Sequence, residues 1–328
     1  MAKDPFNVYV TSVIPEPGLD ILRQNISHVE INSDDHLLSR KELLEKVKGR
    51  DGLLPLLTET IDGEVMDMAG KQLKIIANYA VGFDNIDIRA ATERGIMVTN
   101  TPGVLTDATA DHTWALLFAV TRRVVESDRF TRAGKYKGWG PMMYLGGDIT
   151  GRTLGIVGAG RIGAAVAEKS HGFKMRVLYA DQISNPKIEK YLRAIKVDFK
   201  KLLKESDFIS IHVPLLKSTH HLFNAQAFQL MKKTSYLINT SRGPVVDEAA
   251  LVQALKNGEI AGAGLDVYEE EPRIHPQLIK LHNAVLTPHI ASATIETRTK
   301  MATMAAQNLV DGLRGNRPPN LLNPEVLK

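Results

Sequence analysis

Short apolar runs alternate with longer amphipathic stretches along most of the chain. Helical spacing lies between many of these runs, for example at residues 41–48, 161–169 and 248–257. Strands that alternate with helices are typical of βαβ units, so the pattern predicts an α/β protein with parallel sheets. The runs that have the length and composition of strands cover residues 8–13, 52–57, 74–78, 153–157, 176–180, 208–212, 236–239, 263–267 and 285–287.

Two longer helical patterns divide the chain. One covers residues 107–125 and begins just after Thr106 and Asp107, residue types that can cap a helix N-terminus. The other covers residues 295–313, close to the end of the chain. We predict that both ends of the chain form a discontinuous outer domain around a continuous central domain, with the long helices crossing between them. The predicted domains are residues 1–101 with 291–328, and residues 102–290.

The composition excludes several classes of protein. Of the 328 residues, 44% are hydrophobic and 24% are charged, and the net charge of +4 is not gathered in a basic block, which argues against nucleic-acid binding. The absence of cysteine excludes a disulfide scaffold and fits a reducing compartment. Pro15 and Pro17 interrupt the N-terminal apolar stretch, and the longest apolar run, residues 114–120, is far shorter than a membrane span. We therefore expect a cytoplasmic protein without a membrane anchor.

A glycine motif follows one of the predicted strands. The segment TLGIVGAGRIG has Gly158, Gly160 and Gly163 in Gly-x-Gly-x-x-Gly spacing, with a strand before it and a helix after it. In a dinucleotide site these glycines permit the tight turn, the approach of a pyrophosphate and close helix packing, and the helix N-terminus binds the phosphates. Arg161 would add a charge, and Asp181, after the next strand, would bind the ribose hydroxyls. The alternative is a tight turn beside a solvated aspartate.

Three further polar residues follow predicted strands in the second half of the chain. They are Arg242, Glu271 and His289, and the C-terminal ends of strands in a doubly wound fold meet at one edge, where ligands bind. Spacing alone leaves other interpretations open, since Glu269, Glu270 and Glu271 form an acidic run typical of a solvated loop, and Arg242 could be a surface charge. The sequence has no HExxH motif or similar cluster, so we predict no metal site.

Six segments occur in the order that is typical of one enzyme family. They are NYAVGFDNID, GVLTDATAD, GAGRIG, INTSRGPVVDE, AGAGLDVYEEEP and LTPHIASAT. Over nearly its whole length the chain resembles the D-2-hydroxyacid dehydrogenases, and within them the glyoxylate/hydroxypyruvate reductases. The resemblance implies two doubly wound parallel-sheet domains, a Rossmann-type central domain that binds NAD(H) and a flavodoxin-like substrate-binding domain. It also implies reduction of a small 2-keto acid to the 2-hydroxy acid.

The resemblance assigns a catalytic role to each of the three polar residues. Arg242 would hold the substrate carboxylate and polarise the keto oxygen, for which its planar fork of donors is suited. His289 would donate the proton as hydride arrives. Glu271, selected from the acidic run by the adjacent Pro272, would bond the other ring nitrogen and so fix the tautomer and stabilise the imidazolium. Asp266 would approach the nicotinamide amide.

The remaining binding residues are also implied by the resemblance. The backbone N–H groups of Val81 and Gly82 would bind the substrate carboxylate, and Leu57 would close the pocket. Cofactor contacts would come from Thr106, Gly158, Gly160, Arg161, Ile162, Gly163, Asp181, Pro214, Thr219, Thr240 and Asp266. Because Asp181 would accept bonds from both ribose hydroxyls of NAD and repel the phosphate of NADP, we expect NADH to be preferred.

Sequence differences from related enzymes with other activities narrow the choice of substrate. The loop of residues 53–62 contains no Lys or Arg, and Val81 stands where phosphite dehydrogenases carry Lys, which argues against phosphorylated substrates and phosphite. Met143 stands where similar reductases often have Trp, so a bulkier 2-keto acid remains an alternative substrate. A corepressor that senses NAD is the alternative from another class. The apolar residues 139–145, together with the resemblance, predict a homodimer built through the central domain.

Overall fold

The computed structural model describes residues 3–34 and 36–327, and the chain divides into two compact units. The first unit consists of residues 1–105 and 293–328, and the second of residues 106–292. No helix within the described ranges combines the length and the apolar character needed to cross a membrane.

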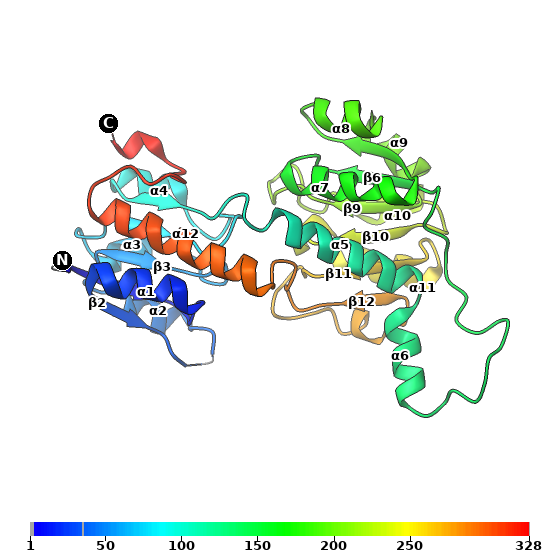
Figure 1. Ribbon diagram of the computed structural model, residues 1–328, viewed down its shortest axis with the longest axis horizontal. Coiled ribbons are helices and arrows are strands. Elements are labelled where there is room, and N and C mark those ends of the chain that lie inside the picture. The colour runs from blue at the N-terminus through cyan, green and yellow to red at the C-terminus, as the bar shows by residue number, and fades with distance from the viewer. Residues whose placement is uncertain (1–2, 35, 328) are drawn as a thin grey trace. The chain divides into compact units, whose positions relative to one another are not determined.

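The first unit is built on a five-stranded sheet whose paired strands are all parallel (Figure 1). Its strand order, 2-1-3-4-5, is that of flavodoxin-like doubly wound folds. In sheet order the strands are β2 (Ile26–Ile31), β1 (Asp4–Val10), β3 (Gly52–Leu54), β4 (Ile75–Ala77) and β5 (Met97–Thr99). The helices are α1 (Glu16–Asn25), α2 (Arg40–Lys46), α3 (Gly63–Ala69), α4 (Ile88–Glu93) and α12 (Ile295–Leu313), with a 3-10 turn at Pro324–Leu327.

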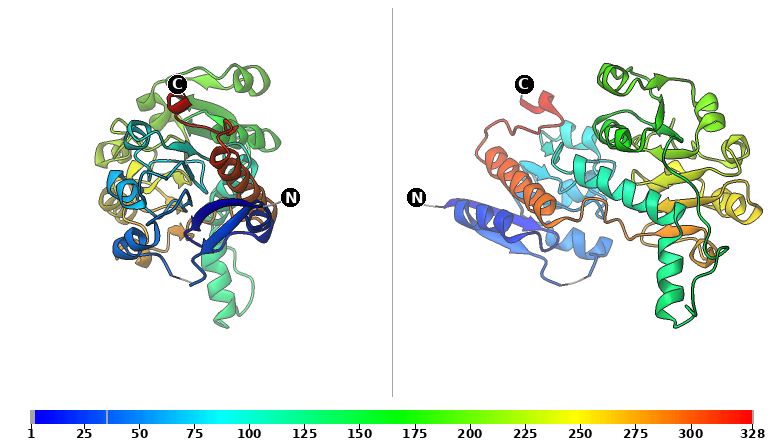
Figure 2. Two further views of the ribbon diagram at one scale, coloured as in Figure 1. Left: turned by 90° about the vertical axis from the view of Figure 1, so that its left-hand side faces the viewer. Right: turned by 45° about the vertical axis from the view of Figure 1, so that its right-hand side comes forward.

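In the first unit, neighbouring residues of the short strands pack against helices on opposite faces of the sheet. Leu53 and Ile76 belong to a buried cluster with residues of α2, α3 and α4, whereas the neighbouring Gly52 and Ile75 pack against α12. Successive side chains of a strand point to opposite faces, which explains why both neighbours are apolar or small. On the α12 face, α1 and α12 lie side by side (Figures 1 and 2).

The second unit is built on a seven-stranded sheet, again with parallel pairing throughout. Numbered within the unit, the strand order is 7-6-5-4-1-2-3, which is the Rossmann order with one added strand. In sheet order the strands are β12 (Ala284–Leu286), β11 (Gly262–Leu265), β10 (Tyr236–Asn239), β9 (Phe208–Ile211), β6 (Thr153–Val157), β7 (Arg176–Ala180) and β8 (Ile195–Lys196). The predicted fold class, two doubly wound parallel-sheet domains, is therefore confirmed.

Helices cover both faces of the sheet in the second unit. Ile238 of β10 packs in a cluster with residues of α5 and α7, and its neighbour Leu237 packs with residues of α9, α10 and α11. The helices are α5 (Thr106–Thr121), α6 (Val124–Arg132), α7 (Arg161–Lys169), α8 (Pro186–Leu192), α9 (Phe199–Glu205), α10 (Ala225–Leu230) and α11 (Glu248–Asn257). Shorter 3-10 turns lie at Ser170–Phe173, Gly243–Val245 and Leu278–Lys280.

The single helix predicted over residues 107–125 is wrong, because the structure divides this region into α5 and α6. Arg123, between them, has a φ of 54°, a left-handed conformation that ends a helix. Its guanidinium pairs with Glu126 at 2.8 Å and lies 5.0 Å from the ring centroid of Tyr144, and these contacts stabilise the bend. Figure 2 shows that α6 and the loop after it extend away from the sheet of this unit.

Candidate active site

The glycine-rich turn joins β6 to α7, and two of its glycines are required by the fold. Gly158 has a φ of 91°, and a Cβ there would lie 2.7 Å from the backbone of His212. A Cβ at Gly163 would collide with the carbonyl oxygen of Gly158. Gly160 differs, because its φ is −69° and a Cβ there would meet nothing within 4 Å. The fold leaves this position open at the N-terminus of α7, which is where a pyrophosphate would approach the backbone.

Asp181 lies beside this turn, at the end of β7. Its carboxylate accepts hydrogen bonds from the backbone N–H groups of Ala159 at 2.7 Å and Ile183 at 3.0 Å. An acid that contacts both the turn and the strand end is suitably placed for a ribose bound across the turn. The turn, the helix N-terminus and the acid therefore fit a dinucleotide.

A lysine that is distant in sequence reaches the loop after Asp181. Lys187, the next cation along the chain, pairs with Glu168 at 2.6 Å. Lys196 of β8 instead reaches the loop after Asp181, where its ammonium donates to the carbonyl of Gln182 at 3.0 Å. Strand pairing between β7 and β8 makes this contact, which linear distance along the chain does not show.

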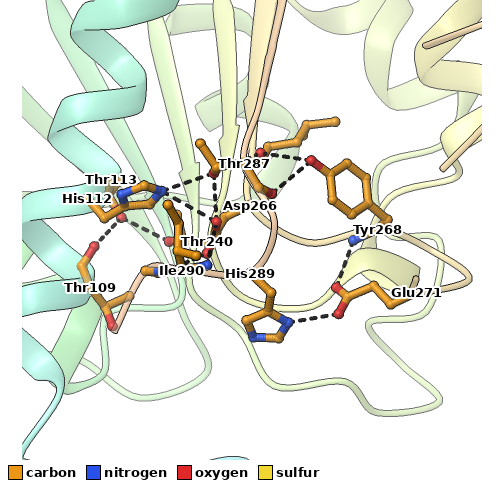
Figure 3. Close-up of polar contacts among 12 residues, drawn as sticks. Thr109, His112, Thr113, Thr240, Asp266, Tyr268, Glu271, Thr287, His289 and Ile290 are labelled. Atoms are coloured by element: carbon orange, nitrogen blue, oxygen red, sulfur yellow. Dashed lines mark hydrogen bonds and ion pairs between the residues drawn. The ribbon is translucent and has the colours of Figure 1, made fainter. Parts of the chain in front are cut away.

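His289 and Glu271 form the central pair of the candidate site (Figure 3). Nδ1 of His289 lies 2.8 Å from Oε2 of Glu271, and the other carboxylate oxygen accepts the backbone N–H of Tyr268 at 3.0 Å. The side chains are 27% and 31% exposed, so the imidazole is accessible from outside. Since Nδ1 faces the carboxylate, it carries a hydrogen, and Nε2 is the nitrogen that can exchange a proton with a substrate.

The backbone around His289 is held by Asp266. His289 has a φ of 54°, which costs a side-chain-bearing residue about 1–2 kcal/mol. Asp266 is fully buried at the end of β11, and its carboxylate accepts the N–H groups of Ile290 at 2.9 Å and Ala291 at 2.7 Å. Burial would raise the pKa of Asp266, but the hydrogen bonds to its carboxylate outweigh this and lower the pKa from its ordinary value. The charged carboxylate thus stabilises the turn that carries His289.

A side chain from α5 completes this network (Figure 3). The hydroxyl of Thr287 donates to Asp266 at 2.6 Å, and Nε2 of His112 lies 3.0 Å from that hydroxyl and 3.4 Å from the Asp266 carboxylate. Because the threonine hydrogen is already committed to the carboxylate, the hydroxyl can only accept from His112. The tautomer of His112 in this network therefore has its hydrogen on Nε2.

The loop that carries Arg242 packs directly on the loop that carries Glu271. A Cβ at Gly243 would collide with the backbone carbonyl of Tyr268, so only glycine allows this approach. The side chain of Asn239, the last residue of β10, donates to the Arg242 carbonyl at 2.9 Å. The structure therefore brings together the backbones that present Arg242 and Glu271, whose predicted catalytic roles remain predictions.

The acidic run of residues 269–271 is not a uniform solvated loop. Glu271 pairs with His289, whereas Glu269 pairs with His221 at 2.6 Å and accepts the N–H of Glu248, the first residue of α11, at 3.0 Å. Glu270 pairs with Arg273 at 3.2 Å on the surface. One carboxylate thus anchors the loop, one faces the imidazole and one is solvated.

The other predicted cofactor residues lie on the same unit. Thr106 begins α5, and Arg161 and Ile162 form the first turn of α7. After β9, the hydroxyl of Thr219 donates to the carbonyl of Pro214 at 2.6 Å and closes that loop. Thr240 follows β10, and its hydroxyl lies 2.9 Å from that of Thr113. Their contacts with a cofactor remain predictions.

In the first unit, the predicted substrate residues lie on two loops that are bonded to each other. The N–H of Tyr79 donates to the carbonyl of Pro55 at 2.9 Å, which joins the loop of Leu57 to the turn of Val81 and Gly82. Buried Glu59 accepts the hydroxyl of Thr11 at 2.8 Å and the N–H of Leu56 at 2.7 Å. This carboxylate stabilises the Leu57 loop from within.

One cation does reach the end of the Leu57 loop. Arg40, distant in sequence, donates to the carbonyl of Thr60 at 2.9 Å. Its guanidinium also pairs with two carboxylates, those of Asp62 at 2.7 Å and Glu64 at 2.5 Å. The positive charge that a phosphorylated substrate would need is therefore already paired with these two carboxylates.

Sequence reasoning missed several residues that organise the site. Thr287 lies two positions before His289 in the LTPH segment, so its place was a usable signal. His112 and Glu269 had no comparable signal, since their partners are 175 and 48 residues away in sequence. No group of three or more metal-ligating side chains occurs among the residues that the structure describes.

Comparison with known proteins agrees with the geometry. Residues 114–291 match the family model for the NAD-binding domain of D-isomer specific 2-hydroxyacid dehydrogenases. The chain is 55% identical to a glyoxylate reductase of Korarchaeum cryptofilum over 98% of its own length and 97% of the relative. A protein from Thermus thermophilus superposes with a TM-score of 0.91 at 48% identity, covering 96% of this chain and 99% of that one.

A second solved structure extends the comparison to a characterised ligand state. It is an NADPH-dependent glyoxylate/hydroxypyruvate reductase from Sinorhizobium meliloti, in complex with NADP and malonate. Its TM-score is 0.85 at 31% identity, and the match covers 98% of both chains. The resemblance seen in the sequence motifs is confirmed, and the chain belongs to the D-isomer-specific 2-hydroxyacid dehydrogenase family.

Proposed function

We propose that the protein reduces a small 2-keto acid, glyoxylate or hydroxypyruvate, with NADH. The observation that carries this proposal is the 2.8 Å pair of His289 and Glu271 in a unit that also presents an open Gly-x-Gly-x-x-Gly turn. The pair provides a proton donor, and the turn fits the dinucleotide. The names of the relatives agree, since that from Korarchaeum cryptofilum is called a glyoxylate reductase.

In the proposed mechanism each residue has a distinct task. The bound dinucleotide supplies the hydride that the keto carbon accepts. Nε2 of His289 donates a proton to the keto oxygen, so that hydride and proton together convert the ketone to the alcohol. Glu271 holds Nδ1 and stabilises the imidazolium before the transfer. Arg242 binds the carboxylate and the keto oxygen, where negative charge develops. In the oxidative direction His289 takes the proton back.

The division of labour follows the two units. We assign NAD(H) binding to residues 106–292, which contain the glycine-rich turn and Asp181, and binding of the keto acid to the unit of residues 1–105 and 293–328. The N–H groups of Val81 and Gly82 bind the substrate carboxylate, and Leu57 excludes water beside it. Asp266 would add a contact to the nicotinamide amide from the turn that it stabilises.

The number of negative charges on the substrate is limited by the cations near its binding loop. The loop of residues 53–62 carries no cation of its own, and Arg40 at its end is paired with Asp62 and Glu64. A second anionic group on the substrate would lack compensation, so a carboxylate is the only charge that the acid should carry.

The test is steady-state kinetics on a substrate panel. Glyoxylate, hydroxypyruvate, 3-phosphohydroxypyruvate and a branched 2-keto acid are compared by kcat/KM with NADH. The proposal expects one of the first two to give the highest value. A higher value for the phosphorylated or branched acid would overturn the substrate assignment, and tight NADH binding without turnover would favour a sensor that binds NAD.

We also propose that the protein is a homodimer built through the second unit. On the loop after α6, Trp139 is 83% exposed and Met142 is 77% exposed, with Leu145 exposed nearby. Such a contiguous apolar segment on an extension of the unit is typical of a surface that a second copy covers. Light scattering at micromolar concentration should give twice the chain mass, and a monomer mass would refute the dimer.

The cytoplasm is the compartment that we propose. The chain has no cysteine, which fits a reducing environment. NADH is also produced and consumed inside the cell. Fractionation that recovered the protein outside the cell would contradict this.

A further inference from the structure

Two adjacent carbonyl groups of the turn after β4 face the same neighbouring segment. The carbonyl oxygen of Ala80 accepts the backbone N–H of Thr101 at 2.9 Å. The next carbonyl oxygen, that of Val81, accepts the side-chain amide of Asn100 at 2.8 Å. In an extended chain successive carbonyls point in opposite directions, so this arrangement departs from the strand pattern.

The orientation of the carbonyls determines that of the N–H groups. In a planar trans peptide, the C=O of one residue and the N–H of the next point in opposite directions. With the carbonyls of Ala80 and Val81 both turned toward residues 100–101, the N–H groups of Val81 and Gly82 both point away from that segment. Two successive N–H groups on one side form a concavity that suits a carboxylate.

We infer that Asn100 is a positioning residue that aims the N–H group of Gly82, next to that of Val81, at the substrate carboxylate. This inference rests on the proposed function, which assigns carboxylate binding to these two amides. Without the Asn100 amide, the peptide between Val81 and Gly82 would lose the bond that sets its orientation. Asn100 acts through this peptide and does not touch the substrate.

The surroundings keep Asn100 and the turn in place. Asn100 is 6% exposed, and its own carbonyl accepts the side-chain amide of Asn308 from α12 at 3.2 Å. On the other side of the turn, the side chain of Asn78 donates to the carbonyl of Gly82 at 2.9 Å. Asn78 is fully buried and also bonds Asn85, so the turn is tied at both ends. Val81 and Gly82 themselves are only half-buried, so this part of the turn lies at the surface.

The test compares Asn100→Ala with a matched control in the same unit. Asn323→Ala removes another buried asparagine, whose amide donates to the carbonyl of Ile96 at 2.9 Å, away from the turn. For Asn100→Ala, we expect KM for glyoxylate and the dissociation constant of oxamate to rise roughly tenfold or more, as for a weakened bond to a charged group. The affinity for NADH, measured by fluorescence, should remain unchanged. Asn323→Ala should lower the melting temperature only.

The outcomes separate this inference from the proposed function. A wild-type protein that reduces no 2-keto acid would refute the proposed function, whereas the inference concerns the difference between the variants. In that case the stabilisation of the wild type by oxamate, which Asn100→Ala should lose, still tests it. Equal KM and oxamate values in Asn100→Ala and the wild type would overturn the inference. If the alanine variant does not fold, Asn100→Asp preserves the volume, removes the donor and should weaken oxamate binding in the same way.

Discussion

Two single variants that each add a methyl group to a glycine of the nucleotide turn should separate an effect on folding from an effect on cofactor binding. At Gly163 a Cβ would collide with the carbonyl oxygen of Gly158 and lie 3.0 Å from a methyl group of Ile156, so the folded unit cannot accept it without moving. At Gly160 a Cβ would meet nothing within 4 Å, and the φ of −69° is open to any residue. A steric penalty at Gly160 should therefore appear only when a ligand approaches.

The steric cost of one methyl group should appear in the melting temperature for one variant and in the affinity for NADH for the other. Overpacking by a methyl group costs about 1–3 kcal/mol. For Gly163→Ala that cost falls on folding and lowers the melting temperature by about 2–12 °C for a unit of this size. For Gly160→Ala it falls on binding, where it corresponds to a roughly 5- to 150-fold weaker affinity for NADH. The loss of glycine at the start of α7 changes the free energy of unfolding by at most about 1 kcal/mol.

The assay pairs thermal unfolding without cofactor with fluorescence titration of NADH, on the wild type and both variants. Gly160→Ala should keep the melting temperature within a few degrees of the wild type, at about 2–4 °C per kcal/mol, and lose affinity for NADH. Gly163→Ala should unfold at lower temperature. If Gly160→Ala bound NADH as tightly as the wild type, the dinucleotide would not approach the backbone at this position, and the turn would have been misread.

Further variants test the catalytic and cofactor assignments. His289→Asn should lower kcat about 10²–10⁴-fold with NADH binding intact, and a variant with more than half the wild-type kcat would contradict the proton-donor role. Glu271→Gln keeps a hydrogen-bonding group but loses the charge that stabilises the imidazolium, so kcat should fall roughly 5-fold or more. The attraction between opposite charges ~4 Å apart is about 1 kcal/mol in water and larger where water is excluded. Unchanged kinetics would count against the role assigned to Glu271. Arg242→Ala should raise KM for the keto acid and lower kcat, whereas a change in NADH affinity alone would show that its placement is wrong. The wild type should prefer NADH by roughly 10- to 1,000-fold, and Asp181→Ser with Gln182→Arg should shift the kcat/KM ratio toward NADPH. An unchanged ratio would exclude Asp181 as the group that reads the ribose.

The parts of the fold that could be predicted from sequence are those with a strong local pattern. The predicted bounds of β6, β7, β10, α7, α11 and α12 agree with the structure. Three strands were missed, and all are outer strands of their sheets. β2 is only partly buried and β8 is exposed, so neither has a buried apolar run. β5 is buried but has only three residues, Met97–Thr99, which is too short for a recognisable run. The bend at Arg123 was missed for another reason, because VTRRVVES continues the helical spacing through it. One of the contacts that stabilise it, with Tyr144, comes from a residue distant in sequence, which no local pattern contains.

In the candidate site too, contacts between residues distant in sequence could not be predicted. Strand ends pointed to Arg242, Glu271 and His289 as candidates, because parallel topology brings the ends of strands to one edge. The family resemblance was needed to select Glu271 from the acidic run and to assign the roles. The groups that support their loops come from elsewhere. His112 of α5 bonds Thr287 and Asp266 beside the turn of His289, and His221, after β9, pairs with Glu269 in the loop of Glu271. Sequence motifs single out the candidate reacting groups, whereas the supporting bonds depend on packing between elements that are distant in sequence.

The hydrogen bonds that Asp266 accepts stabilise the backbone turn that carries His289. His289 adopts a left-handed backbone conformation, and the carboxylate compensates for it by accepting the two N–H groups that follow. Charged acceptors form stronger hydrogen bonds than neutral ones, so this compensation requires ionised Asp266. Because the pKa of Asp266 is lowered in the folded protein, the stabilisation is fully present above the ordinary pKa of an aspartate, and it is lost only as pH falls through the lower folded value. Around neutral pH the turn that carries His289 therefore keeps its geometry, which the proposed proton-donor role would require of its scaffold.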